Sequence, residues 1–372
     1  MNFIKVSITR SAQLTLAYAL LCCGSFAQVS VPDKVVAQRA EEYLRALARD
    51  EQFSGVILLA RNGKVLLSKG YGLANREHEI PNTPETKYRI ASITKEFTAT
   101  AIMMLQEKGK LDVHDSICKY VPECLPSWQP ITLHHLLNHT SGIPEFYQSF
   151  KDIDSIRRTP TTIAKTFERA RAVAPAFTPG EKVGYSSQGY MLLGYVIERT
   201  SGETYENFLK KNIFEPLKMA DTGLESQKAI LKRRAYGYTR DKDKGLINAP
   251  FYDLSYISAG GGLYSTVEDL YLWEQALQTE KLLKQSSLAA MFTPGLEDYG
   301  YAWEISRRHN RQIIRADGRS FGFSTSLARY PNEKVTIIVL SNLETAGADK
   351  IADALAAIIF GERRAEEPDH KE

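Results

Sequence analysis

The sequence has almost no excess of charge of either sign. Its 372 residues include 47 lysines and arginines and 44 acidic residues, for a formal net charge of +3, whereas proteins that bind nucleic acid usually carry a dense basic face. Beyond the first 27 residues there is also no run of the ~18 apolar residues that a membrane helix needs. We therefore expect a mature protein that is soluble and has no nucleic-acid partner.

Residues 1–27 have the features of a secretory signal peptide. Lys5 and Arg10 precede a short apolar run over residues 14–23, and the Ser-Phe-Ala sequence at 25–27 fits a small-x-small cleavage site. Because the apolar run is too short to span a bilayer comfortably, we predict cleavage rather than anchoring. The expected location is therefore periplasmic or secreted.

Cysteine is scarce, with four residues in the chain. Cys22 and Cys23 would leave with the signal peptide, so only Cys118 and Cys124 would remain in an oxidising compartment. A short-loop disulfide between them and two reduced cysteines near a surface loop are both compatible with the sequence, because a bridge needs a geometry that sequence does not show.

Strand patterns occupy both ends of the chain, and helical patterns lie between them. "SGVILLA" and "KVLLSKGYG" flank the hairpin signal "RNG", and "YAWEISRR", "RQIIRA", "STSLARY" and "KVTIIVLSN" follow near the C-terminus. Helical periodicity appears over residues 34–49, in several runs within about 110–250, and over 350–360. We predict an α+β domain over residues 28–360, with an antiparallel sheet from both chain ends, an inserted helical subdomain and a cleft between them. Residues 361–372 read as a solvated, disordered tail.

The stretch "RIASITKEFTATAIMML" places Ser92 three residues before Lys95 at the start of an apolar helix. A lysine in a first turn is unfavourable, because it faces the positive end of the helix dipole. Lys95 would have a reason to be there if it took the proton of Ser92, which is a poor nucleophile without a base. The alternative is a serine N-cap with an incidental lysine. A second match, "SICK" at Ser116, runs into "YVPECLP" instead of an apolar helix, so context favours Ser92.

Several segments in this order make the chain similar to a known enzyme family. They are "ASITKEFTA", "ITLHHLLNHTSGIP", "FTPGEKVGYSSQGYMLLGYVIE", "IFEPLKM", "SAGGGLYSTVEDLYLW" and "GFSTSLARYPNEKVTIIVLSN", spread over roughly residues 34–360. The chain thus resembles the serine hydrolases of the class C β-lactamase and D-Ala-D-Ala carboxypeptidase type, whose Ser-x-x-Lys motif supplies the nucleophile. The resemblance implies a β-lactamase/transpeptidase-like fold, an acyl-enzyme on Ser92, and no metal or cofactor.

The family's second motif, Tyr-x-Asn, corresponds here to Tyr185-Ser186-Ser187. By resemblance, Tyr185 would lie near Lys95 and carry the proton between Ser92 and the leaving group. Ser187 replaces the asparagine, and a hydroxyl does not offer the paired donor and acceptor of an amide. A strict Tyr-x-Asn match at Tyr205 falls in a different part of the family pattern, and we interpret it as a decoy.

The third motif, usually Lys-Thr-Gly or His-x-Gly, corresponds to Ala316-Asp317-Gly318. By resemblance, Gly318 would let the substrate backbone approach the strand, and the Arg319 N–H would join the Ser92 N–H in the oxyanion hole. The basic side chain is missing at Ala316. Arg315 or Arg319 would have to replace its charge, whereas Asp317 would repel a substrate carboxylate.

Two other patterns suggest sites that we consider and set aside. His135 and His139 are four residues apart, a zinc-ligand spacing, but the metalloprotease glutamate does not follow His135. We expect packing or capping roles for both, away from the catalytic serine. The glycines at 260–262 lack the spacing and lysine of a phosphate loop, and they predict close backbone packing near the cleft.

The resulting prediction is a serine hydrolase that uses Ser92, Lys95 and Tyr185, with Ser187, Gly318 and Arg319 at the substrate. Its substrate would be a small-molecule or peptide ester or amide, with β-lactams and D-amino-acid peptides as the family's usual range. One alternative is an esterase with little action on β-lactams. Another is a catalytically silent protein that keeps the cleft to hold cell-wall fragments. We also expect an association with the cell wall.

Overall fold

The computed structural model describes residues 31–122, 124–145, 152–171 and 173–362. From Val31 onward the chain groups into one compact unit. The predicted signal peptide at 1–27 and most of the predicted tail at 361–372 lie outside the described residues. Within the described part, no helix is both long and apolar enough to cross a bilayer.

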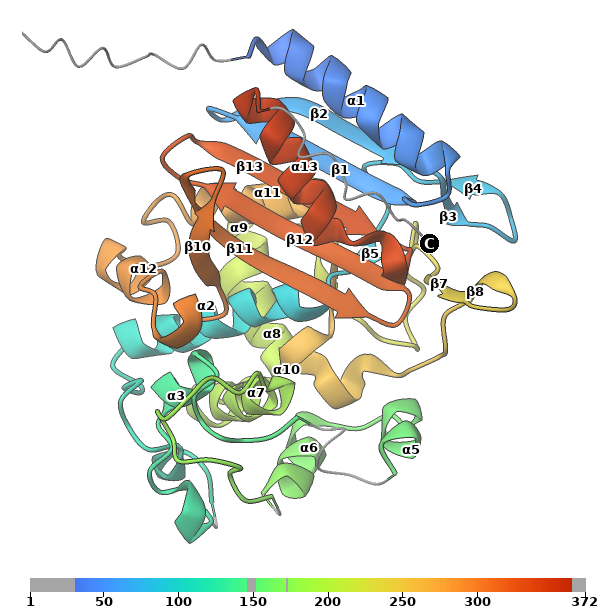
Figure 1. Ribbon diagram of the computed structural model, residues 1–372. Coiled ribbons are helices and arrows are strands. Elements are labelled where there is room, and N and C mark those ends of the chain that lie inside the picture. The colour runs from blue at the N-terminus through green and yellow to red at the C-terminus, as the bar shows by residue number, and fades with distance from the viewer. Residues whose placement is uncertain (1–30, 123, 146–151, 172, 363–372) are drawn as a thin grey trace, which may run out of the picture. The chain divides into compact units, whose positions relative to one another are not determined.

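A six-stranded antiparallel sheet forms the centre of the unit and takes strands from both ends of the chain (Figure 1). The C-terminal strand β13 pairs with the N-terminal strand β1, from Val335 opposite Arg61 to Ser341 opposite Gly55. The predicted α+β architecture is therefore confirmed. In spatial order the strands are β10 (Glu304–Arg308), β11 (Arg311–Ser320), β12 (Phe323–Tyr330), β13 (Val335–Ser341), β1 (Gly55–Arg61) and β2 (Lys64–Tyr71).

The turn between β1 and β2 is the one predicted from the "RNG" sequence. Asn62 and Gly63 both have positive φ, 54° and 76°, as a two-residue type I′ hairpin requires. The two strands then pair from Arg61 opposite Lys64 to Gly55 opposite Tyr71. The hairpin places β1 in the interior of the sheet and β2 at its edge.

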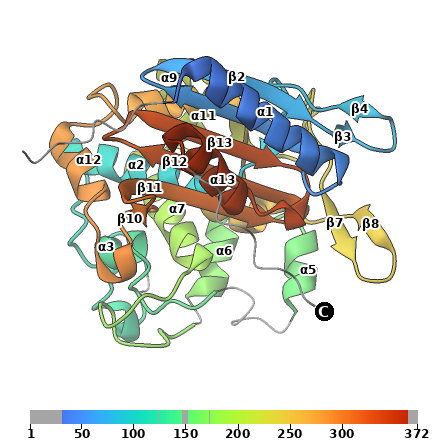
Figure 2. The same ribbon diagram turned by 45° about the horizontal axis from the view of Figure 1, so that its top comes forward.

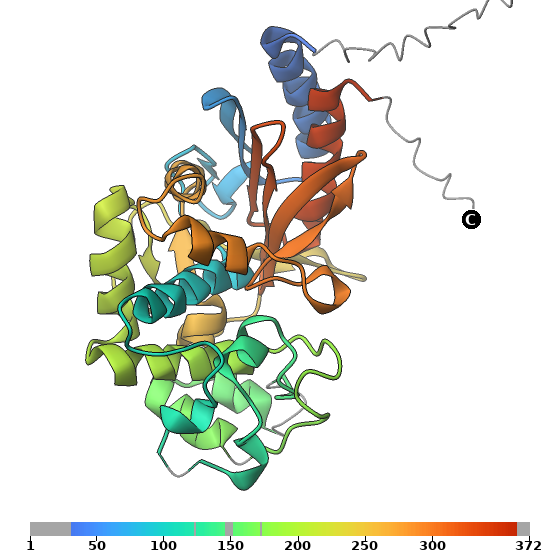
Figure 3. The ribbon, with the colours of Figure 1, turned by 90° about the vertical axis from the view of Figure 1, so that its left-hand side faces the viewer.

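Each face of the sheet is covered by helices. α1 (Asp33–Arg49) and α13 (Ala348–Phe360) lie side by side over one face (Figure 2), where their apolar residues pack on Ile57, Ile313 and Ile337. The opposite face packs on α2 (Thr94–Glu107) and α11 (Val267–Ala276), and beyond α2 lies the helical part of the chain (Figure 3).

α2 is the central helix of the molecule. Every residue from Thr94 to Leu105 is buried, because the sheet lies on one side of the helix and α7 (Ser187–Ser201) on the other. From Phe97 to Leu105 the only polar residues of the helix are threonines, as expected for a helix that is buried on all sides. Lys95 therefore enters the interior with the first turn of α2, and the half-buried Ser92 lies immediately before that helix.

The remaining elements are short. Between residues 110 and 250, where the sequence predicts helices, the chain also forms a hairpin that turns over residues 242–244. Its second strand begins at Gly245, whose φ is +73°. Over the whole described chain, the short helices are α3 (Leu133–Leu137), α5 (Ile153–Arg158), α6 (Ile163–Ala170), α8 (Tyr205–Leu209), a π-helical turn (Lys210–Phe214), α9 (Glu215–Leu217), α10 (Ser258–Gly261) and α12 (Gln285–Met291). The strands are β3 (Leu73–Asn75), β4 (Ile80–Pro81), β5 (Tyr88–Arg89), β6 (Gly223–Leu224), β7 (Tyr238–Asp241), β8 (Gly245–Asn248) and β9 (Leu263–Ser265).

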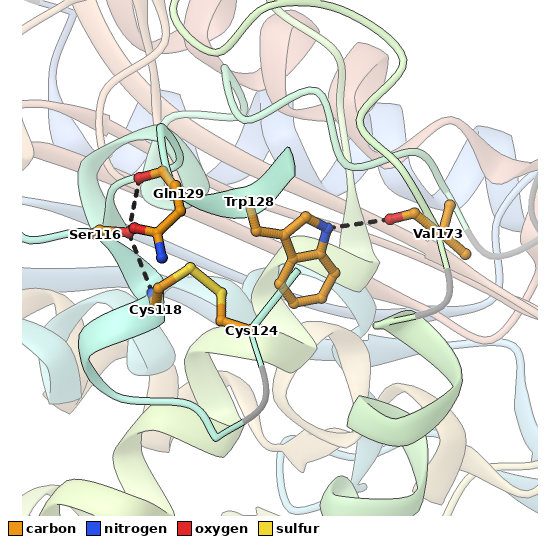
Figure 4. The surroundings of a disulfide bond; sticks show 6 residues. All are labelled: Ser116, Cys118, Cys124, Trp128, Gln129 and Val173. Atoms are coloured by element: carbon orange, nitrogen blue, oxygen red, sulfur yellow. Dashed lines mark hydrogen bonds between the residues drawn. A yellow bond between two sulfur atoms is a disulfide. The ribbon is translucent and has the colours of Figure 1, made fainter. Parts of the chain in front are cut away.

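Cys118 and Cys124 form a disulfide in the helical part, which resolves the choice left open by the sequence (Figure 4). Their Cα atoms are 5.2 Å apart, within the range that a bridge allows. Nearby, the Trp128 Nε1 donates a hydrogen bond to the Val173 carbonyl at 3.1 Å. The bridge and this bond tie a loop that has little regular structure of its own.

Candidate active site

Ser92 lies in a 3₁₀ turn (Ala91–Ile93) immediately before α2. It does not cap the helix: Ile93 is the N-cap residue of α2, and no side chain caps it. Instead the Ser92 Oγ accepts hydrogen bonds from the Lys95 Nζ at 3.1 Å and from the Tyr185 hydroxyl at 2.7 Å. The N-cap alternative is therefore wrong, and the three predicted catalytic side chains meet at one oxygen atom.

The Lys95 side chain is held from several directions. Only 2% of the residue is exposed, and its Nζ donates to the Gly260 carbonyl at 2.7 Å and to the Ser187 Oγ at 3.3 Å. The same ammonium lies 4.8 Å from the centre of the Tyr185 ring, a cation–π distance. The dipoles around Lys95 make up for the unfavourable position at the helix start.

The glycines at 260–262 explain how a backbone carbonyl reaches Lys95. A Cβ atom on Gly260 would lie 2.9 Å from the Ser187 carbonyl oxygen, so a larger residue would push α10 away from α7. The predicted close backbone packing is confirmed, and it delivers the Gly260 carbonyl to the site.

Ser187 is the first residue of α7, and it contacts Lys95 rather than an open surface. Its N–H and its Oγ both donate to the Glu145 Oε1, at 2.9 and 2.8 Å. The Ser187 hydroxyl thus donates to a carboxylate and accepts from an ammonium.

The strict Tyr-x-Asn match at Tyr205 and the second Ser-x-x-Lys match at Ser116 make contacts that do not involve Ser92. The Tyr205 side chain is buried, and its hydroxyl pairs with the Thr98 Oγ1 at 2.7 Å; burial raises its pKa. Ser116 caps a 3₁₀ turn by accepting from the Cys118 N–H, and Lys119 pairs with Asp115 at 2.7 Å on the surface. Both motif matches have structural roles.

The third motif lies on β11, and its side chains alternate between the two faces of the sheet. Ala316 packs with the helices around α2. Arg315 forms ion pairs with Asp317 at 3.0 Å and with Asp353 of α13 at 3.3 Å. The Arg315 and Asp317 side chains, on either side of Ala316 in the sequence, therefore lie on the face of the sheet that α13 covers. Glu304 is a further carboxylate on Arg315, at 3.3 Å. The guanidinium is shared by three carboxylates, which offset its positive charge beside Ala316.

Asp317 lines the same cavity as Ser92 and Lys95. Desolvation by the surrounding protein raises the pKa of its carboxyl group to about 6, although 36% of the side chain remains accessible to solvent. Opposing this, the charge of Arg315 lowers the pKa. Repulsion of a substrate carboxylate by Asp317 would therefore be partial near this pH.

Gly318 has a packing role that the sequence did not predict. A Cβ atom at this position would lie 2.5 Å from the Ile90 carbonyl oxygen and 3.0 Å from the Ala91 Cβ. The glycine therefore lets β11 approach the turn that carries Ser92, and its role toward the substrate stays a prediction. Arg319 follows on the same strand, in the part of β11 that does not pair with β10. Its oxyanion role stays a prediction.

The histidines of "HHLLNH" separate into two roles. The His135 Nδ1 accepts the Thr132 N–H at 3.2 Å, and the Thr132 hydroxyl in turn caps α3, as a capping role predicts. His139 is wrongly predicted to lie away from the catalytic serine: it lines the same cavity of about 80 Å³ as Ser92, Lys95 and Tyr185. Among the described residues there is no group of three or more His, Cys, Asp or Glu side chains that could hold a metal ion.

Sequence reasoning missed three residues of the site. His139 and Glu145 come from one segment, and Tyr299 lies in the loop before β10. The sequence does not show that the segment "HTSGIPE" lies close to Ser92, because 47 residues separate Ser92 from His139 in the chain. No local pattern reveals such a contact.

Comparison with known proteins agrees with this geometry. The Beta-lactamase family matches residues 36–361. A penicillin-binding protein of Bacillus subtilis (strain 168) is 30% identical over 337 residues, which are 85% of this chain and 74% of the relative. The octameric penicillin-binding protein homologue from Pyrococcus abyssi superposes with a TM-score of 0.80 at 32% identity, over 89% of this chain and 78% of that one.

A second solved structure extends over nearly the whole of its own chain. The penicillin-binding protein from Bacillus halodurans has a TM-score of 0.76 and 28% identity, and covers 85% of this chain and 99% of that one. The family match, over residues 36–361, includes the elements that carry Ser92, Tyr185 and Ala316. The chain belongs to the β-lactamase family of serine hydrolases.

Proposed function

We propose that this protein is an exported acyl hydrolase that forms an acyl-enzyme on Ser92. The observation that carries the proposal is the convergence of the Lys95 ammonium and the Tyr185 hydroxyl on the Ser92 Oγ, at 3.1 and 2.7 Å. Such contacts let a proton leave the serine as its oxygen attacks a carbonyl carbon.

In the first half-reaction Tyr185, having released its hydroxyl proton to solvent, accepts the Ser92 proton as the Ser92 Oγ bonds to the carbonyl carbon of the substrate. Lys95, 4.8 Å from the ring centre, stabilises the phenolate charge. The Ser92 and Arg319 N–H groups would bind the developing oxyanion. Tyr185 then passes the proton to the leaving alcohol or amine as the bond to carbon breaks.

In the second half-reaction a water molecule attacks the acyl carbon of the ester on Ser92. Tyr185 takes a proton from the water, and the Ser92 Oγ leaves as the alcohol after regaining a proton. The 40% exposure of Tyr185 favours this step, because a water molecule needs access to the base. The products are a carboxylic acid and free enzyme.

The substrate range follows from the charges around the cavity. β-Lactams and peptide C-termini present a carboxylate, and the family binds it with a basic side chain where this chain has Ala316. Arg315 is already bound by three carboxylates. We therefore propose esters and amides without that carboxylate as the better substrates, including D-amino-acid derivatives, and only weak turnover of penicillins.

Export is the other part of the proposal. It rests on the N-terminal segment 1–27 and gains support from the Cys118–Cys124 bridge, because disulfides persist in oxidising compartments. Expression of the full chain in a bacterial host and mass analysis of the periplasmic protein would show a new N-terminus near residue 28. Retention of Met1 in cytoplasmic protein would contradict export.

The test of the activity compares kcat/KM for p-nitrophenyl acetate, D-alanine p-nitroanilide and benzylpenicillin. We expect turnover of the ester and the anilide and a much lower value for the penicillin. Preference for the penicillin would overturn the proposed substrate range. Absence of turnover for all three would favour the silent binding protein.

A further inference from the structure

The His139 ring packs against the ring of Tyr185, whose phenol the proposed mechanism uses. The centres of the His139 and Tyr185 rings are 4.3 Å apart with an interplanar angle of 32°. Tyr190 and Tyr299 enclose the imidazole at 5.2 and 5.6 Å, and only 1% of His139 is exposed. The Tyr185 ring, which is otherwise 40% exposed, therefore has its inner face packed against a buried ring.

The position of the His139 ring is fixed from the backbone side. Its Nδ1 accepts the Ser186 N–H at 3.1 Å, and its carbonyl accepts the Gly184 N–H at 2.8 Å. These two bonds flank Tyr185 in the sequence. The loop that carries the phenol is thus tied to His139 on both sides of the residue that reacts.

The same contacts determine the charge and the tautomer of the imidazole. An Nδ1 that accepts a hydrogen bond carries no proton, so the proton of a neutral ring lies on Nε2. Burial, and then the charge of Lys95, hold the pKa of His139 well below its usual range. His139 is therefore uncharged at neutral pH.

We propose that His139 is a positioning residue, which fixes the Tyr185 phenol over Ser92 through ring stacking and the flanking backbone bonds. This inference rests on the proposed acyl transfer at Ser92. Tyr185 is exposed on its outer face, so without the imidazole its ring would gain rotational freedom. A displacement of about 1 Å in such a group can cost a factor of about 100 in rate.

His139→Asn is the most direct test. Residue 139 has a φ of +62°, a conformation that asparagine tolerates, and its side-chain oxygen can accept the Ser186 N–H in place of Nδ1. The variant therefore keeps the backbone bond and removes the ring. We expect kcat for p-nitrophenyl acetate to fall at least about tenfold with KM within about twofold, because positioning acts on the reacting state.

His135→Asn is the matched control. Its Nδ1 accepts the Thr132 N–H in the same manner, and it does not line the cavity. We expect kcat of His135→Asn to stay near wild type, even if both variants lose some thermal stability. A kcat of His139→Asn within about twofold of wild type would overturn the positioning role.

Two further measurements keep the outcomes distinct. If Ser92→Ala is inactive while His139→Asn is fully active, only the inference fails; if Ser92→Ala keeps wild-type turnover, the proposed function fails and the inference with it. Should His139→Asn not fold, ¹⁵N NMR of the wild-type imidazole decides. A neutral ring with its proton on Nε2 at pH 7 supports the proposal, and a cation or an Nδ1–H tautomer overturns it.

Discussion

Ser92 is distinguished from the other serines of the chain by the groups around its oxygen. Ser116, which belongs to an equally good Ser-x-x-Lys match, donates to the Gln129 carbonyl and accepts the Cys118 N–H. Ser92 instead accepts from Lys95 and Tyr185. The same residue type is a cap in one place and a candidate nucleophile in the other, because only one of the two is followed by a helix that enters the core.

Tyr185→Phe removes the hydroxyl that contacts Ser92 and leaves the ring in place. If that hydroxyl carries the proton, kcat for an ester should fall by a factor of about 10² to 10⁴. KM and the melting temperature should change little, because the side chain is 40% exposed. Steady-state kinetics and thermal melting measure both effects.

Tyr205→Phe is the control for that change, since Tyr205 belongs to the strict Tyr-x-Asn match. It should leave kcat nearly unchanged and lower the free energy of unfolding by about 1–3 kcal/mol, through loss of the buried bond to Thr98. A large fall in kcat for Tyr205→Phe, or none for Tyr185→Phe, would reverse the assignment of the two tyrosines.

Ala316→Lys should restore a cation at the third motif. Ala316 lines the cavity with Ser92, and a charge-assisted hydrogen bond to a carboxylate is worth about 1.5–3 kcal/mol. Acylation by benzylpenicillin should therefore accelerate about tenfold or more. Ala316→Met has similar length and no charge, and an equal acceleration in that variant would contradict the electrostatic explanation.

At the scale of elements, periodicity was enough to predict the sheet, its hairpin and the buried α2. Those features depend on local alternation and on turns such as Asn62-Gly63, which the sequence displays. The positions of His139 and Glu145 were not predictable in the same way. They depend on how the segment after α3 packs against α7, which is a long-range contact.

α2 carries a buried carboxyl group that the catalytic scheme does not use. Glu96 accepts the Trp273 Nε1 of α11 at 2.6 Å, and burial raises its pKa well above the usual range. The folded state therefore holds a proton that the unfolded state releases above about pH 4.5. This contribution to stability is lost as the pH rises from the unfolded pKa toward the folded one.

Glu96→Gln stays uncharged and can still accept the Trp273 bond. Relative to wild type, its free energy of unfolding should therefore increase steadily as the pH is raised from about 4.5 to neutrality. Urea denaturation at several pH values measures the difference. A difference that does not depend on pH would show that Glu96 is ionised in the folded protein.

The disulfide should stabilise the loop without affecting catalysis. It closes a short loop, with a sequence separation of 6 residues, and the chain-entropy estimate for such a loop is about 2 kcal/mol. Replacing Cys118 and Cys124 together with serine should lower the free energy of unfolding by about that amount and leave kcat unchanged. Loss of activity in a folded double variant would show that this loop affects the active site.

At the scale of the whole molecule, the site needs every layer of the fold. Ser92 and Lys95 come from the start of α2, Tyr185 and Ser187 from the loop and first turn of α7, and Ala316 from β11. Glycines make the approaches between these layers close enough, as at Gly260 and Gly318. Family membership determines this arrangement better than it determines the substrate.

The central claim is that Ser92 is an activated nucleophile. Its most direct test is the intact mass of wild type and Ser92→Ala after exposure to a fluorophosphonate, followed by peptide mapping. Our account predicts one adduct on wild type, located at Ser92, and none on the variant. An unlabelled wild type, or equal labelling of both proteins, would contradict it.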